Sequence, residues 1–132
     1  QRVIRLPQCS RADFLAVLAA CDVGLDTFGF SGGNTSLDAF SVGLPVLTLP
    51  GEFMRGRQTF AMLALMSSAI EASLVARDAD DYVRITTTLL GDSETRETMQ
   101  RAIRVESPRL FEDVRAVAAL RAALLSAVRG TA

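Results

Sequence analysis

The sequence predicts an α/β fold, a short parallel sheet followed by a helical segment, and three observations support this. Apolar runs of strand length occur at residues 2–7, 22–28 and 45–50. Each run is followed by apolar residues at helical spacing, which is typical of parallel strands joined by right-handed crossovers. In the second half only helical spacing remains. We therefore expect β/α units over residues 1–70 and helices over residues 71–132.

The first strand and the first helix are marked by a proline and a capping pair. Residues 2–7 alternate apolar and polar side chains, and Pro7 ends the run. Ser10, with Asp13 three residues later, is a typical helix start, because such side chains can bond the free N–H groups of the first turn. Apolar residues then recur at helical spacing as far as Cys21.

The middle of the chain repeats this alternation. Residues 22–28 form a short apolar run of strand length, and a glycine-containing loop follows. A short helix around Phe40 is closed by Gly43, the residue type that most often ends a helix. Residues 45–50 are a strand bounded by prolines, which cannot sit inside a ladder. Residues 55–67 have helical spacing again.

Three further helices are expected in the second half. Asp78 can cap the first of them, and Ser93 can cap the second, which extends to about Arg104. Pro108 separates these from a last helix, whose apolar residues lie one or two turns apart. The sequence shows no internal repeat and no flexible linker between these segments.

Length and composition indicate a single globular domain. The chain has 132 residues, 49% of them apolar and 22% charged, which is the balance of a folded protein. Three strands are fewer than most Rossmann-like sheets contain. We therefore expect part of the sheet to lie outside this chain, and the chain to be a truncated piece of a longer protein. An unpaired sheet edge can pair with another copy, so a homodimer is one expected assembly.

The composition excludes several classes of function. The chain has no His, which excludes a Ser-His-Asp triad, an HExxH zinc site and any His general base within it. The formal charge of −1 gives no basic surface for nucleic acid or an anionic membrane. No apolar run approaches the roughly 20 residues that a bilayer requires. Cys9 and Cys21 are expected to be buried free thiols in a reducing compartment, which predicts a cytoplasmic protein.

The loop after the second strand carries the most specific local signal. Residues 27–36 read TFGFSGGNTS, at the place where ligands collect in an open α/β sheet. Gly32 and Gly33 let backbone N–H groups approach a ligand. Asn34 and Thr35 stand where a helix begins, and the free N–H groups of a helix start together with its dipole attract an anion.

A phosphate followed by a ribose would match the order of groups in this loop. Asp38 lies one turn into the helix, where its carboxylate suits a pair of sugar hydroxyls. The alternative is an ordinary strand-to-helix turn, since Gly-Gly before Asn-Thr-Ser is also a good helix cap. The loop is neither a GxGxxG fingerprint nor a P-loop.

Residues 22–57 also resemble a known family. The segments DVGLDT, SGGNTSLD and GLPVLTLPGE, followed by Arg57, occur in the order and at the spacing of glycosyltransferase family 41, the O-linked N-acetylglucosamine transferases. The similarity is to the C-terminal catalytic subdomain, is closest to the bacterial, SPINDLY-like members, and extends from about Val3 to the last helix. The resemblance implies the C-terminal half of a GT-B glycosyltransferase with two Rossmann-like halves.

The same resemblance implies an activity. Family members are inverting, metal-independent enzymes that bind a UDP-sugar mainly in the C-terminal half. We therefore expect this chain to be the UDP-sugar-binding part of an enzyme that transfers N-acetylglucosamine to protein Ser or Thr. It implies no cofactor and no metal, the donor being a substrate. The acceptor half, its tetratricopeptide repeats and a diphosphate-contacting Lys have no counterpart here, so we expect the isolated chain to be inactive.

The resemblance also assigns roles to individual residues. It implies that the loop formed by Gly32, Gly33, Asn34 and Thr35 contacts the diphosphate, and that Asp38 contacts the ribose. The animal enzymes have His-Thr-Thr where this chain has Gly33-Asn34-Thr35, so backbone N–H groups would replace an imidazole contact.

Three residues near the N-terminus are placed at the nucleotide by the same resemblance. The backbone around Cys9 would meet the uracil edge, and Phe14 would stack on the base. Arg11 would supply a cation near the nucleotide. Each has a structural alternative, with Phe14 in the core and Arg11 on the solvated surface.

No residue of the chain is a credible general base, so the set of catalytic residues is empty. Asp26 is closest in position, and we interpret it as a structural acid that ends its strand. Glu52 and Arg57 are expected to brace their turn. Two other functions stay open: the nucleotide-sugar-binding half of another GT-B glycosyltransferase or epimerase, and a non-catalytic module for protein association.

Overall fold

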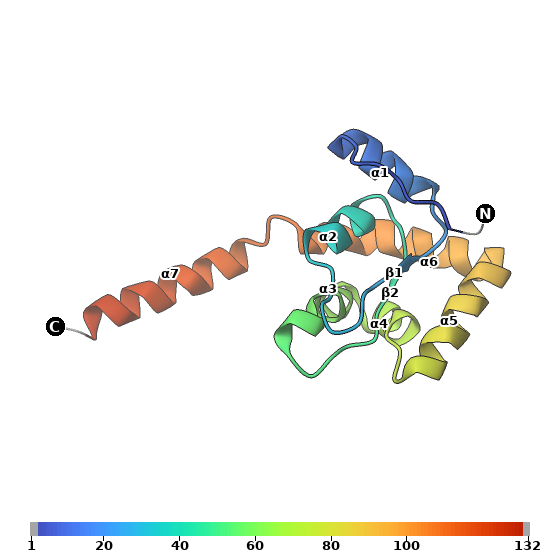
Figure 1. The fold of residues 1–132 in the computed structure, drawn as a ribbon. Helices are drawn as coiled ribbons and strands as arrows, with labels where there is room; N and C mark the ends of the chain where they lie inside the picture. Colours follow the sequence, from blue (N-terminus) through green and yellow to red (C-terminus); the bar gives the residue numbers. More distant parts are fainter. Residues whose placement is uncertain (1–2, 131–132) are drawn as a thin grey trace.

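A two-stranded parallel sheet lies at the centre of the computed structural model, which describes residues 3–130 (Figure 1). Strand β1 (Gly24–Leu25) pairs with β2 (Val46–Leu47), and Gly24 lies opposite Val46. A parallel bridge between Thr48 and Val75 adds a third segment beside β2. The predicted parallel sheet is therefore present, but it is small, and most of the described chain is helical.

The helices form the bulk of the molecule around this sheet. In chain order the helical elements are α1 (Arg11–Ala20), α2 (Asn34–Ser41), the 3₁₀ helix η1 (Met54–Gly56), α3 (Gln58–Met66), α4 (Ser68–Leu74), α5 (Ala79–Gly91), α6 (Ser93–Glu106), the 3₁₀ helix η2 (Ser107–Leu110) and α7 (Val114–Arg129). Helix α7 projects away from the rest of the structure (Figure 1). In residues 3–130 no helix combines the length and apolar character needed to cross a membrane.

Local caps set the helix starts. The side chain of Ser10 accepts the N–H of Asp13 and begins α1, as predicted. Asp78 in the same way begins α5, which confirms the second expected cap. For α6 the predicted cap, Ser93, is wrong by one residue. Asp92 is the cap, and Ser93 is the first residue of the helix. Gly43 follows α2 with a φ of 82°, a left-handed conformation that glycine adopts without strain.

The predicted strand at residues 2–7 is wrong over the residues that the structure describes. Residues 3–10 have no regular secondary structure, and Val3, Ile4 and Leu6 are exposed; residue 2 lies outside the described range. A strand exists only where a neighbouring strand completes its hydrogen bonds. No described segment offers such a ladder to residues 3–7, so the alternating pattern there forms no strand.

The hydrophobic core lies between β2 and the helices that cover it. Phe40 from α2, Leu47 from β2, Leu63 from α3, Leu74 from α4 and Ile103 from α6 are each fully buried. Burying a side chain of this size stabilises the fold by about 1.5–3 kcal/mol. Because five elements pack together here, the loop after the carboxyl end of β1 begins beside a well-packed core.

Two predictions on the cysteines differ in outcome. Cys9 and Cys21 are unpaired, as expected, but both are exposed rather than buried. Cys9 belongs to the irregular segment before α1, and Cys21 directly follows the last turn of α1. Both positions are at ends of elements, where the apolar periodicity of the sequence does not predict burial.

Candidate functional site

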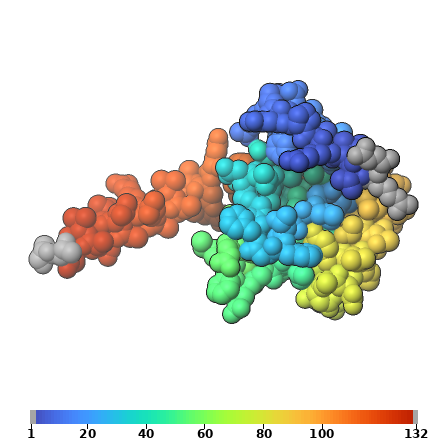
Figure 2. Space-filling view, viewed as in Figure 1, coloured from blue at the N-terminus to red at the C-terminus, as the bar shows by residue number. Residues whose placement is uncertain are grey.

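The loop between β1 and α2, residues 26–33, lies at the carboxyl end of the sheet and reaches the molecular surface. Figure 2 shows it between α1 on one side and the segment that contains η1 and α3 on the other. Gly29 has a φ of 78°, so the turn there uses a left-handed conformation. Asp26 at the start of the loop and Ser31 within it are buried, as is Ser36 in the first turn of α2.

A buried carboxylate organises the inner side of this loop. Asp26 is 8% exposed and accepts four hydrogen bonds. Its Oδ1 accepts from the N–H of Thr27 (3.1 Å) and of Gly32 (2.7 Å). Its Oδ2 accepts from the hydroxyls of Ser31 (2.6 Å) and Thr48 (2.7 Å). Four donors fill the acceptor sites of the carboxylate, so Asp26 is a structural group rather than a free base.

Helix α3 provides a second set of contacts through Thr59. Its N–H donates to Ser31 Oγ at 2.9 Å, and its hydroxyl lies 2.8 Å from Ser36 Oγ. The same hydroxyl donates to the carbonyl of Gly32 at 3.3 Å. Thr59 is fully buried. The glycine loop is therefore held from the strand side by Asp26 and from the helix side by Thr59.

Three successive N–H groups at the start of α2 remain available. Within residues 3–130, the backbone N–H groups of Gly33, Asn34 and Thr35 make no hydrogen bond to protein. The first bonds of the helix run from the N–H groups of Ser36 and Leu37 to the carbonyl of Gly33, each at 3.1 Å. No side chain caps this end. The arrangement leaves donors and the positive end of the helix dipole open to an anion.

A cavity of about 270 Å³ lies beside these donors, between α1, α2 and the sheet. It brings together three of the predicted site residues, Phe14, Gly32 and Thr35. Its remaining lining consists mainly of small and apolar side chains together with Asp26: Leu18, Gly24, Leu25, Asp26, Thr27, Ser36, Ala39, Leu44 and Val46. Phe14 is half-buried and forms part of the cavity wall.

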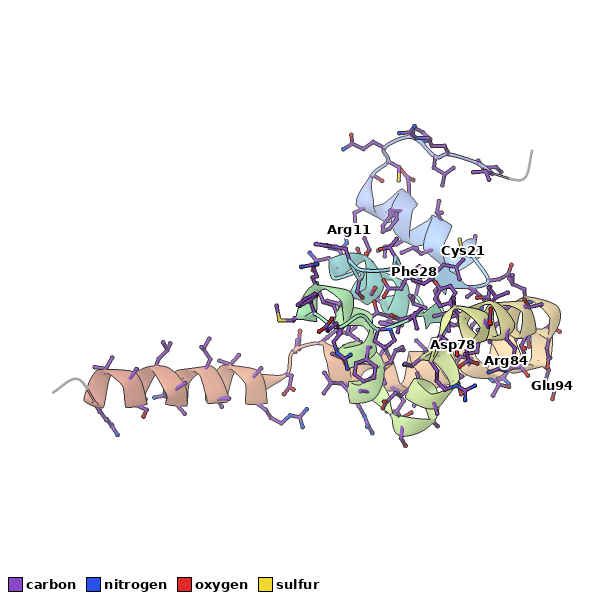
Figure 3. The ribbon with its side chains drawn as sticks, turned by 60° about the horizontal axis from the view of Figure 1, so that its bottom comes forward. Arg11, Cys21, Phe28, Asp78, Arg84 and Glu94 are labelled. Atoms are coloured by element: carbon purple, nitrogen blue, oxygen red, sulfur yellow. The ribbon has the colours of Figure 1, made fainter. Side chains whose placement is uncertain are left out.

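Arg11 and Asp38 contact one another. Arg11 Nη2 lies 2.7 Å from Asp38 Oδ1, joining α1 to α2. The side chain of Arg11 is 77% exposed and that of Asp38 19% exposed. Figure 3 shows Arg11 at the side of α1 that faces α2. Exposed ion pairs contribute about 0–1 kcal/mol, so a ligand that engages Asp38 can compete with Arg11 at small cost.

The other predicted residues lie around this site without lining the cavity. Asn34 and Cys9 are exposed, and Cys9 immediately precedes the cap of α1. Gly33 faces α3, because a Cβ added there would lie 2.9 Å from Gln58 Oε1. Gln58 is a neighbour of the loop that sequence reasoning did not identify.

The turn after β2 flanks the same site. Arg57 donates from Nη1 to the carbonyl of Gly51 at 3.0 Å, and its guanidinium lies 4.8 Å from the centre of the Phe60 ring. Arg57 therefore braces the turn, whereas Glu52 is exposed and makes no ion pair in the described chain. The N–H of Ser31 donates to the carbonyl of Arg55 at 2.7 Å and ties this turn to the glycine loop.

Tyr82 of α5 is a further residue at the site, and the sequence alone assigned it no role there. Its hydroxyl donates to the carbonyl of Asp26 at 3.0 Å, and the carbonyl of Leu47 lies 3.4 Å away. Its ring packs edge-on against Phe28, with 5.0 Å between ring centres. Burial, and then the negative charge of Asp26, raise the pKa of Tyr82 to about 12. No sequence signal pointed to this contact, which joins residues 56 positions apart.

Larger hollows elsewhere contain none of the predicted site residues. One of these hollows, of about 540 Å³, is lined in part by Arg77, Asp81 and Arg84 around the start of α5. Among residues 3–130, no group of three or more His, Cys, Asp or Glu side chains is placed to hold a metal ion.

Comparison with known proteins identifies the family. The model of glycosyl transferase family 41 matches residues 2–119. A probable UDP-N-acetylglucosamine–peptide N-acetylglucosaminyltransferase SPINDLY of Eustoma exaltatum subsp. russellianum is 26% identical over 110 residues, which is 77% of this chain and 12% of that protein. The corresponding SPINDLY protein of Hordeum vulgare is 25% identical over 99 residues, 73% of this chain and 10% of that protein.

A solved structure shares the fold. A mutant O-GlcNAc transferase of Thermobaculum terrenum superposes with a TM-score of 0.73 and 33% sequence identity, over 82% of this chain and 20% of that one. This chain thus spans about a tenth of its curated relatives and a fifth of the solved chain. Since the family model covers most of the sequence, this protein belongs to glycosyl transferase family 41.

Proposed function

We propose that this chain forms the UDP-sugar-binding part of an inverting, metal-independent glycosyltransferase of the GT-B type. The parent enzyme would transfer N-acetylglucosamine from UDP to a protein Ser or Thr. The observation that carries the proposal is the row of three unbonded N–H groups at Gly33, Asn34 and Thr35 beside a cavity of about 270 Å³. Such a row binds a diphosphate by hydrogen bonds and by the helix dipole.

The geometry suggests an arrangement of the donor. The diphosphate would lie against the start of α2, and the ribose would extend toward Asp38. The base would enter the cavity and lie against Phe14, near Arg11 and Cys9. Asp38 has one carboxylate oxygen, Oδ2, outside its ion pair with Arg11. A carboxylate accepts hydrogen bonds from a pair of sugar hydroxyls.

The chemical contribution of this chain would be electrostatic. When the bond between the sugar C1 and the β-phosphate oxygen breaks, negative charge grows on the UDP leaving group. N–H groups that already point at this oxygen stabilise the charge without reorganising, and an oriented donor of this kind contributes about 3–4 kcal/mol in enzymes. The acceptor hydroxyl attacks C1 from the opposite face, and its proton leaves to a group that this chain does not supply.

Within residues 3–130, no carboxylate at the site is left for that role once Asp38 contacts the ribose. Asp26, the only carboxylate in the cavity wall, has its acceptor positions filled by four donors. We therefore expect the isolated chain to bind UDP and to catalyse no transfer. This expectation matches the short span of the chain relative to its relatives.

The test is a titration of the isotope-labelled chain with UDP, followed by the amide resonances of the glycine loop. The N–H resonances of Gly33, Asn34 and Thr35 should shift, and uridine, which lacks phosphates, should move them less. Asp38→Asn should weaken UDP binding about tenfold through loss of a charged hydrogen-bond acceptor. Asp80→Asn, an exposed aspartate in α5, serves as the matched control. Unchanged loop resonances at saturating UDP would exclude nucleotide binding and leave a module for protein association.

A further inference from the structure

The N–H of Gly33 is turned toward the proposed diphosphate by contacts on its neighbour, Gly32. A trans peptide group is planar, and its C=O and N–H point in opposite directions. The carbonyl of Gly32 points inward, where the Thr59 hydroxyl donates to it at 3.3 Å. The N–H of Gly33 belongs to the same peptide group, so it points outward.

The peptide group between Ser31 and Gly32 is also held by a buried side chain. The N–H of Gly32 donates inward to Asp26 Oδ1 at 2.7 Å. Both peptide groups that flank the Gly32 Cα are thus fixed to buried side chains. Ser31 links the two holding residues, because its hydroxyl donates to Asp26 Oδ2 at 2.6 Å and lies 2.9 Å from Thr59 Oγ1.

The two side chains that hold Gly32 are buried. Asp26 is 8% exposed and Thr59 is fully buried, so protein covers most of the surface of both side chains. Within residues 3–130 no Arg forms an ion pair with Asp26, whose charge is held by hydrogen bonds alone. A buried carboxylate without a counter-ion is costly for stability unless its hydrogen bonds are complete, so the bond from the N–H of Gly32 is one of the four that keep Asp26 in place.

We propose that Asp26 and Thr59 are positioning residues that hold both peptide groups of Gly32 inward and thereby aim the N–H of Gly33 at the bound diphosphate. The inference rests on the proposed function, since it deepens the account of the same site. Thr59 does not line the cavity, and Asp26, which does, has both carboxylate oxygens bonded to protein donors. Asp26 acts through the N–H of Gly32 and Thr59 acts through its carbonyl.

Pairs of substitutions separate positioning from folding. Thr59→Val keeps the shape of the side chain but removes the hydroxyl, whereas Thr59→Ser keeps the hydroxyl. Asp26→Ala removes the acceptor for Gly32, whereas Asp26→Asn retains one oxygen for the two N–H donors and turns its amide toward the hydroxyls of Ser31 and Thr48. Asp81→Ala is the control, because Asp81 is also a buried aspartate, 7% exposed, and bonds only residues of its own helix end.

The measurements are the affinities for UDP and for uridine, each on the fully folded fraction of the chain. Asp26→Ala and Thr59→Val should weaken UDP binding at least tenfold and leave uridine binding within about twofold, because uridine does not use the N–H of Gly33. Asp26→Asn and Thr59→Ser should restore most of the UDP affinity. Asp81→Ala should leave both affinities unchanged. Equal losses for UDP and uridine, or no recovery in the conservative variants, would overturn the proposal.

Amide hydrogen exchange supplies a readout that needs no nucleotide. In the unmodified chain the N–H of Gly32 should exchange slowly and that of Gly33 rapidly. Asp26→Ala should remove the protection of Gly32, and Asp26→Asn should retain it. If the unmodified chain binds no UDP, the proposed function fails, and this exchange pattern alone decides whether Asp26 positions the loop. Protection of Gly32 that survives Asp26→Ala would refute positioning.

Discussion

At residue 32 the loop has no room for a side chain. A Cβ on Gly32 would overlap Ser36 Oγ and lie 2.9 Å from Thr35 Oγ1. Both hydroxyls belong to the start of α2, so a larger residue would displace the three free N–H groups. The glycine is required here by close approach rather than by an unusual φ, which the sequence alone does not distinguish.

Gly32→Ala should therefore destabilise the chain by about 1–3 kcal/mol, the usual cost of overpacking, and should weaken UDP binding. Urea unfolding followed by circular dichroism measures the first effect. Gly91→Ala is the control, because Gly91 lies in α5 and a Cβ there meets nothing within 4 Å. Because Gly91 is the last residue of α5, that variant should change the free energy of unfolding by less than about 0.5 kcal/mol. Equal stability of Gly32→Ala and the unmodified chain would contradict the expected overlap.

Tyr82 is the only tyrosine of the chain and there is no Trp, so its ionisation can be followed without interference. Its folded pKa of about 12 lies above the ordinary value of about 10. The neutral phenol is favoured in the folded state, so its stabilising contribution is complete below about pH 10 and is lost as the pH rises through 12. Tyrosinate absorbance should titrate near 12 in buffer and near 10 in denaturant. Coincident titrations would show that the hydroxyl is not buried against Asp26.

At the scale of single elements, α5 contains three successive threonines whose hydroxyls bond the backbone of their own helix. Thr86, Thr87 and Thr88 are poor helix formers. Each of their hydroxyls donates to the carbonyl four residues earlier, at 2.7–3.0 Å. The helix begins at the Asp78 cap and carries Tyr82 on its buried face. The position of Tyr82 at the site therefore depends on where α5 begins.

Asp81, in the first turn of α5, should make the free energy of unfolding depend on pH in the acid range. Hydrogen bonds from Arg77, and then from Arg84, hold its pKa well below the usual range. The stabilisation is therefore present above about pH 4, the unfolded pKa, and is lost as the pH falls below it. Asp81→Asn should lower the urea midpoint at neutral pH, and the difference from the unmodified chain should shrink in acid. Asp80→Asn, in the same turn but exposed, should leave the urea midpoint unchanged both at neutral pH and in acid. A difference that stays constant with pH would argue against the arginine contacts.

For the whole molecule, α7 is the element least integrated with the rest. Its residues 114–129 are all exposed, and none of them belongs to the core cluster. Figures 1 and 2 show it extending from the body of the molecule. An isolated helix of this length is marginally stable in water, so its apolar residues contribute little to the stability of the folded body.

Ending the chain before Asp113 should consequently change the free energy of unfolding by less than about 0.5 kcal/mol. The reference substitution is Ile103→Ala in α6, which removes a fully buried side chain and should cost about 2–5 kcal/mol. Urea unfolding of both variants gives the comparison. A large loss on shortening would show that α7 packs on the body in solution.

The sequence by itself determined the features that are set by neighbours along the chain. The caps at Ser10 and Asp78, the turn at Gly43 and the start of α2 after Gly33 follow from bonds between residues a few positions apart. Such bonds form wherever the local residues allow them, so the pattern was sufficient. The position of the candidate loop at the end of β1 was predicted on the same basis.

Only the tertiary structure decided which distant residues meet at this site. Arg11 pairs with Asp38 across 27 positions, Thr59 bonds Ser31 across 28, and Tyr82 reaches Asp26 across 56. It also decided that residues 3–7 form no strand, because no described segment pairs with them. The physical reason is the same for all four. A contact between distant segments forms only when packing of the core offsets the entropy of bringing them together, and no local pattern records that balance.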